Sequence, residues 1–216
     1  MKLIKIILIV SVLLGLSKTA FAFIVINEFL ADVPLGGIGD ANRDGIRSSA
    51  QDEFIEIVNW GNSEVLFSQW FIKDGSSVRH VFDVGTILGP YDCIVVFGGG
   101  TPRGFDVQAV TASSGGLSLN NDGDVIQLFD SSKNMIDEVV FGPEANNDQS
   151  LSRYPDGKGV FKPHSEIIDA QGFLFSPGKR VDGAPFASST VPEPTHCFLF
   201  GLGAIFHFVR KHSKKG

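Results

Sequence analysis

Short apolar runs recur about every ten residues through the middle of this chain, and each run ends at Gly, Asn, Asp or Pro. Val, Ile and Phe dominate the runs, as is typical of β-strands, and the apolar spacing of an amphipathic helix is not found between them. The runs predict strands at residues 23–31, 53–59, 65–74, 78–84, 92–98, 124–130 and 135–142. Many short strands at this spacing indicate an all-β fold, an antiparallel β-sandwich.

Local patterns add detail to this prediction. The residues "SSKN" at 131–134 predict a hairpin turn between the last two strands. In "DEFIEIVN", Glu56 shares a strand face with its apolar neighbours at 54 and 58, and we expect that face to be half covered. Trp60 and Trp70 are expected to be packing residues, with carbohydrate stacking as the alternative.

The first 22 residues have the parts of a secretory signal peptide. Lys2 and Lys5 precede an apolar stretch, and Ala20-Phe21-Ala22 forms an A-x-A cleavage pattern. We therefore expect the exported chain to begin at Phe23, the alternative being an uncleaved membrane anchor.

The chain ends in "VPEPTHCFLFGLGAIFHFVRKHSKKG", residues 191–216. The apolar segment at 197–209 is shorter than the roughly 20 residues of a stable membrane span, and the Lys and Arg residues behind it favour a cytoplasmic tip with the domain outside. The segment resembles the PEP-CTERM sorting signal of Gram-negative bacteria. That resemblance implies transient anchoring in the inner membrane, cleavage by an exosortase-type enzyme and a link to exopolysaccharide; the alternative is a plain C-terminal anchor. The candidate processing residues are Ala22, Pro192, Glu193, Pro194, Arg210 and Lys211.

The part of the chain between these two ends is strongly acidic. Residues 23–194 contain 11 Lys and Arg against all 24 Asp and Glu, a net charge of −13. Such a charge disfavours nucleic-acid binding and favours association with cations. Cys93 lies in an apolar run and Cys197 in the tail segment, so no disulfide framework is expected.

Several segments together resemble the lamin tail domain. They are "INEFLAD", "DEFIEIVNWGNSEVLFSQWFIKDGS", "LSLNNDGDVIQLFDSSKNMIDEVVFG", "QSLSRYPDGKGVFKPHS" and "SPGKRVDGAPF", within residues 24–186. The resemblance implies an immunoglobulin-like antiparallel β-sandwich that acts as a binding or structural module rather than as an enzyme. The expected organisation is a signal peptide at 1–22, the sandwich at 23–186, a linker at 187–190 and the sorting signal at 191–216.

The stretch "DANRDG" is the opening pattern of a calcium loop, because it presents three side-chain oxygens at alternate positions before a glycine. An EF-hand would place a Glu at position twelve, where this chain has Gln51, but the next two residues are acidic. The candidate Ca²⁺ ligands are Asp40, Asn42, Asp44, Ile46, Asp52 and Glu53. The alternative is a solvated turn, since Asp, Asn and Gly favour turns without any metal.

We expect a non-enzymatic structural or binding protein of the cell envelope, cell surface or extracellular matrix. His80 and His164, the two histidines of residues 23–194, do not lie in a recognisable nucleophile motif. The first alternative is a polysaccharide-binding module that uses exposed aromatic and carboxylate side chains. The second is a metal-dependent hydrolase built around Asp40 and Asp44.

Overall fold

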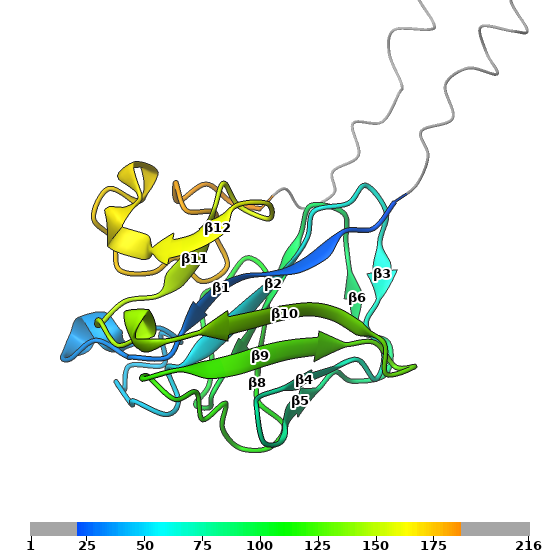
Figure 1. Ribbon diagram of the computed structural model, residues 1–216, viewed down its shortest axis with the longest axis horizontal. Helices are drawn as coiled ribbons and strands as arrows, with labels where there is room; N and C mark the ends of the chain where they lie inside the picture. The colour runs from blue at the N-terminus through cyan, green and yellow to red at the C-terminus, as the bar shows by residue number, and fades with distance from the viewer. Residues whose placement is uncertain (1–20, 187–216) are drawn as a thin grey trace, which may run out of the picture.

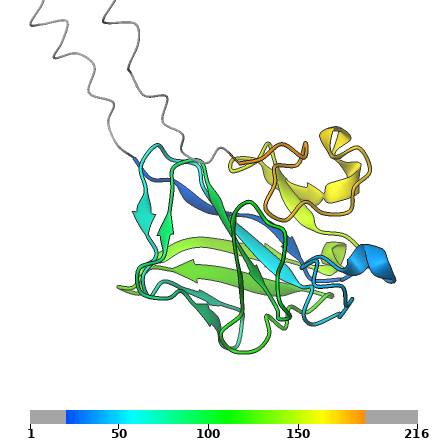
Figure 2. The ribbon, with the colours of Figure 1, turned by 180° about the vertical axis from the view of Figure 1, so that it is seen from behind.

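The computed structural model describes residues 21–186, which form a sandwich of β-sheets (Figures 1 and 2). The strands are β1 (Ile24–Leu30), β2 (Phe54–Asn59), β3 (Val65–Leu66), β4 (Phe71–Lys73), β5 (Val78–Val81), β6 (Ile87–Leu88), β7 (Cys93–Phe97), β8 (Gln108–Thr111), β9 (Asp124–Phe129), β10 (Met135–Phe141), β11 (Leu151–Tyr154) and β12 (Val160–Pro163). Helical structure in the described residues is limited to the short 3-10 turns η2 (Gly37–Gly39), η3 (Pro143–Ala145), η4 (His164–Glu166) and η5 (Ile168–Ala170). Within this part of the chain no helix has the length and apolar character needed to cross a membrane.

The strands form a six-stranded sheet in the order β12-β11-β1-β2-β7-β8, a four-stranded sheet β10-β9-β4-β5 and a small pair β3-β6. All pairings are antiparallel except that of β7 with β8. The all-β prediction is therefore confirmed, with one parallel pair that it did not include. The hairpin between β9 and β10 is also present at the predicted place.

The main core lies between the two larger sheets. Ile26 and Ile57 from the six-stranded sheet and Leu128 from β9 are buried there, together with Phe67. Trp70 is half-buried against this core and stacks on Phe67 with ring centroids 4.4 Å apart, as expected for a packing residue.

The single strand predicted at 65–74 is wrong. The structure has β3 and β4 there, which belong to different sheets, and the chain turns between them. Gln69 has a positive φ of 61°, and the N–H of Trp70 bonds the carbonyl of Phe67. The apolar run is continuous in sequence because Phe67 and Trp70 both pack into the core from this turn.

The C-terminal arm, residues 149–186, adds β11 and β12 to one edge of the six-stranded sheet and then folds back over its outer face. Phe175 packs near Phe54 on that face, and Phe186 packs against Val25 and Val58. The expectation that Glu56 lies on a half-covered face is therefore wrong: Glu56 is fully buried. The arm that covers it is more than 100 residues away in the sequence.

Candidate functional site

The acidic loop between β1 and β2 is folded around its own side chains. Asn42 Oδ1 accepts a hydrogen bond from the N–H of Asp44, and Asp44 Oδ1 accepts one from Ile46, both at 2.9 Å. Asp40 Oδ2 accepts one from Gly45 at 2.9 Å. The alternating oxygens therefore stabilise the turn, which is a common local role of Asp and Asn.

Asp52 joins this loop and Glu53 does not. The carboxylate of Asp52 accepts hydrogen bonds from the N–H groups of Asn42 at 3.0 Å and Ser48 at 2.7 Å. Burial, and then the charges of Asp40 and Asp44, raise the pKa of Asp52. Glu53 instead accepts a hydrogen bond from the N–H of Leu119 at 3.4 Å. The structure thus brings together Asp40, Asn42, Asp44 and Asp52, with Ile46 in the same turn, its side chain exposed.

The calcium site stays a prediction. Residues 21–186 show no group of three or more His, Cys, Asp or Glu side chains placed to hold a metal ion. One observation favours a cation nonetheless, because Asp40 Oδ1 is buried and has no hydrogen-bond partner among the described residues. A carboxylate oxygen of this kind is a suitable ligand for Ca²⁺.

If the loop binds calcium only when folded, we expect millimolar Ca²⁺ to stabilise the chain by about 1.4 kcal/mol at ten times the Kd. The measurement is the thermal midpoint with Ca²⁺ and with chelator. The double variant Asp40→Ala, Asp44→Ala should lower the midpoint in chelator, since it removes loop hydrogen bonds, and should abolish the response to Ca²⁺. A response that survives both substitutions rules out this loop, as do equal midpoints in the unmodified chain.

Of the candidate processing residues, Ala22 is described by the structure and is exposed just before β1. The others, Pro192, Glu193, Pro194, Arg210 and Lys211, lie outside the described residues, as does the apolar segment at 197–209. The sorting prediction is therefore not tested by the fold.

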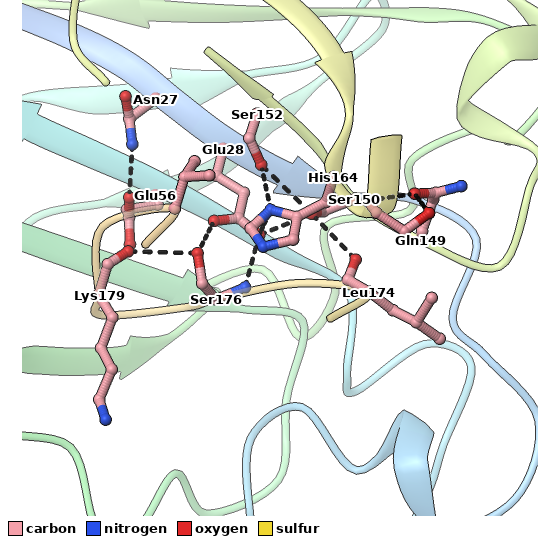
Figure 3. Close-up of polar contacts among 12 residues, drawn as sticks. Asn27, Glu28, Glu56, Gln149, Ser150, Ser152, His164, Leu174, Ser176 and Lys179 are labelled. Carbon is pink, nitrogen blue, oxygen red and sulfur yellow. Dashed lines mark hydrogen bonds and ion pairs between the residues drawn. The ribbon is translucent and has the colours of Figure 1, made fainter. Parts of the chain in front are cut away.

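A buried polar cluster lies between the outer face of the six-stranded sheet and the C-terminal arm, with members from both (Figure 3). We define it by its five main members, Asn27, Glu28, Glu56, Asp156 and His164. The register of β1 against β2 shifts between Ile26 and Glu28, a β-bulge that leaves Asn27 without a partner in the ladder. Asn27 and Glu28 both contact the arm as a result.

Glu28 holds the arm through three hydrogen bonds. Its Oε1 accepts bonds from Ser150 Oγ at 2.6 Å and from the N–H of Ser176 at 2.8 Å, and its Oε2 accepts one from Ser176 Oγ at 2.9 Å (Figure 3). These donors are 26 residues apart in the arm, whereas Glu28 is in the first strand. Since its side chain is fully buried, the carboxylate depends on these donors in place of water.

Glu56 and Asp156 also accept hydrogen bonds that hold the C-terminal arm in place. Glu56 accepts hydrogen bonds from Asn27 at 3.0 Å and from the N–H of Gly178 at 2.8 Å. Asp156 accepts one from Asn27 at 3.1 Å and faces the N–H of Val181 at 3.4 Å. Burial, and then the charge of Glu28, raise the pKa of Glu56 well above its usual range, and burial raises the pKa of Asp156. The cluster therefore fixes the arm at Ser176, Gly178 and Val181.

His164 is fully buried beside Glu28. Its Nδ1 lies 2.7 Å from Ser152 Oγ and 3.6 Å from Glu28 Oε1. A Ser-His-carboxylate relay needs the serine and the carboxylate on opposite ring nitrogens, but here both face the same one. His164 Nε2 is buried without a hydrogen-bond partner in the described chain. The geometry is thus unsuited to nucleophilic catalysis.

This cluster was not predicted from the sequence. Its signal was the presence of polar residues inside otherwise apolar strands, Asn27 and Glu28 in "IVINEFL" and Glu56 in "FIEIV". Polar residues at such positions are normally paired when they are buried. Their partners lie in the C-terminal arm, which the strand patterns did not connect to β1 and β2.

The fold and the cluster define a class, an all-β sandwich of mainly antiparallel sheets in which buried polar groups hold the C-terminal arm against the first two strands. A family model for the Lamin Tail Domain matches residues 18–143, more than half of the 216 residues, and the chain belongs to that family. A comparison with curated proteins gives no match. The matched region ends before the C-terminal arm, so His164 and the donors of Ser176 and Gly178 lie beyond it.

Proposed function

We propose that this chain is an exported, non-catalytic structural or binding module of the cell envelope or extracellular matrix. In this proposal the N-terminal signal exports it, and the PEP-CTERM signal delivers it through the inner membrane to an exosortase-type enzyme. The observation that carries the proposal is the position of the two ends of the described chain. Both lie at the same end of the sandwich, at the top of Figures 1 and 2, where Phe186 packs against Val25 near the start of β1.

This arrangement suits a domain that is attached to a membrane during processing. Attachment through either terminus of the domain would place the same end of the sandwich next to the membrane. The opposite end and both sheet faces would then point away from the membrane. The acidic loop at 40–53 lies beyond the other end of β1, away from Phe23. The loop would therefore face the surroundings of the cell rather than the membrane.

The site chemistry supports a non-catalytic role. In the cluster, Ser152 and Glu28 face one nitrogen of His164. In the acidic loop, no histidine lies among the residues that the structure brings together, so the loop offers no imidazole as a general base. Cys93 is fully buried, and burial raises the pKa of its thiol well above the usual range, which makes it unreactive. A buried, inert thiol is compatible with an oxidising compartment.

The sorting proposal predicts that the mature protein lacks both ends. Intact-mass analysis of protein from the native host is expected to show a chain that begins at Phe23 and ends near Pro194. Replacing Arg210, Lys211, Lys214 and Lys215 by neutral residues should let unprocessed chain escape, because these charges halt translocation. Lengthening the apolar segment to about 20 leucines should instead give a stable anchor. A dominant mature form that still carries residues 197–216 contradicts the proposal.

A further inference from the structure

The outer face of the four-stranded sheet lies uncovered in the described part of the chain. The C-terminal arm packs on the six-stranded sheet, and Figure 1 shows β9 and β10 at the front with no described segment crossing over them. Ile126 and Leu128 of β9 point into the core. The alternation of a strand therefore turns Val125, Gln127 and Phe129 to the outer face.

The strand register places the outward side chains in three rows that cross the sheet. In order along β9, the rows are Val140–Val125, Glu138–Gln127–Lys73 and Met135–Phe129–Phe71. The first and last rows are apolar, and Val140 and Met135 are 75% and 53% exposed. The middle row is polar, with a carboxylate at one end and an ammonium at the other. Gln127 Nε2 donates a hydrogen bond to Glu138 Oε2 at 2.6 Å, which holds that carboxylate in the row.

The two phenylalanines of this face pack on each other rather than on the core. The rings of Phe71 and Phe129 are stacked, with centroids 5.0 Å apart and planes 11° apart. Both side chains are half-buried, and neither belongs to a core cluster of the described residues. Apolar and aromatic side chains that gather on one exposed face are typical of a surface that another molecule covers.

We propose that this face binds the same face of a second copy of the chain, with a two-fold axis that runs along β9. The rotation places β10 of each copy over β4 of the other and keeps each row opposite its counterpart. Lys73 of each copy then meets Glu138 of the other, while Phe129 of one copy meets Phe129 of the other. The face is therefore self-complementary, as a two-fold dimer requires.

The charges of the middle row select this axis. An axis across the strands would instead place Lys73 over Lys73 and Glu138 over Glu138, and like charges in contact are strongly unfavourable. Residues 23–194 carry a net charge of −13, which opposes association at long range, so the apolar rows must supply the attraction. A face three strands wide is small for a permanent interface, and we therefore expect a reversible dimer.

The test is sedimentation equilibrium of the full chain in a density-matched detergent, over concentrations from micromolar to millimolar. We expect the unmodified chain to pass from monomer to dimer across this series. Val140→Glu should weaken the association about tenfold or more, since it places a charge in an apolar row. Val160→Glu is the matched control and should associate like the unmodified chain, because Val160 is 69% exposed but lies in β12 of the other sheet.

An exchange of charges tests the axis. Lys73→Glu and Glu138→Lys each place like charges opposite one another, and each should weaken the association about tenfold or more. The double variant brings opposite charges together again and should associate as tightly as the unmodified chain. The thermal midpoint of each variant establishes that it is folded.

Any of three outcomes overturns the inference: the chain is a monomer at every concentration, Val140→Glu associates like Val160→Glu, or the double charge variant associates no more tightly than the single ones. Association through the apolar ends of the chain would give the second outcome, because a substitution in β10 leaves those ends unchanged. The inference does not depend on the sorting route. A failure here leaves the sorting proposal standing, and a failure of intact-mass processing leaves the dimer standing.

Discussion

Glu28→Ala is expected to destabilise the folded chain by about 2–4 kcal/mol, because it removes three hydrogen bonds to the arm, leaves the N–H of Ser176 without its acceptor and opens a cavity in the buried face. Glu28→Gln should cost less, since an amide oxygen can still accept from the N–H of Ser176 while the Ser176 hydroxyl turns to accept from the amide. The measurement is the free energy of unfolding from urea titration. Glu64→Ala, at an exposed position before β3, is the control and should change little.

A second readout separates loss of the arm from general damage. If Glu28 holds the arm, amide hydrogen exchange at residues 174–181 should accelerate in Glu28→Ala more than exchange in β9, which belongs to the other sheet. Equal stability of Glu28→Ala and Glu64→Ala would show that the carboxylate does not hold the arm.

The dependence of stability on pH should change in opposite directions in Glu53→Gln and His80→Asn. Burial raises the pKa of Glu53 from 4.5 to about 7, so its favourable contribution is complete below pH 4.5 and is lost as the pH rises to about 7. Burial lowers the pKa of His80 from 6.5 to about 4, so its contribution is complete above pH 6.5 and is lost as the pH falls towards 4. Each of these pKa shifts corresponds to a change of about 3 kcal/mol in the free energy of unfolding across the pH range concerned.

In the unmodified chain these two contributions oppose each other between pH 4.5 and 6.5. Glu53→Gln keeps a neutral acceptor for the N–H of Leu119 and should make the slope of stability against pH more positive over this window than in the unmodified chain. His80→Asn keeps an acceptor for the N–H of Ser113 and should make the slope of stability against pH more negative than in the unmodified chain. Urea unfolding from pH 4 to 7.5 gives both profiles. Glu64→Gln should retain the profile of the unmodified chain. If Glu53→Gln and His80→Asn also retain that profile, the two pKa shifts are refuted as sources of the pH dependence.

Strand positions could be predicted from the sequence wherever an apolar run was also one strand. The strands β1, β2, β5, β7, β9 and β10 all fall within predicted ranges. Three strands lack a strong apolar pattern and were not predicted: β8 ("QAVT"), β11 ("LSRY") and β12 ("VFKP"). Each forms by hydrogen bonding to a neighbouring strand, which the composition of the segment alone does not show. The turn at Gln69 was hidden because the residues around it are apolar for reasons of core packing.

The candidate sites were predictable to a different degree. The acidic loop was found because Asx turns and metal loops share the same local residue pattern, and that shared pattern is also why its role could not be decided. The buried cluster was missed because alternation along β2 shows which residues share a face with Glu56 but not what covers that face. The cover comes from Gly178, 122 residues further along the chain.

The pairing of the first strand with the last segment also sets when the domain can finish folding. The N–H of Ser176 that bonds Glu28 is separated from it by 148 residues. Until the chain as far as Ser176 is available, the outer face of β1 and β2 lacks its cover. The side chains of Glu28 and Glu56, and the Val and Phe side chains beside them, are then still in contact with water. Folding therefore cannot be completed from the N-terminal end as the chain emerges, since contacts of such long range form only after most of the chain is available. The contact between β1 and the C-terminal arm therefore forms late, when nearly the whole domain is available to fold.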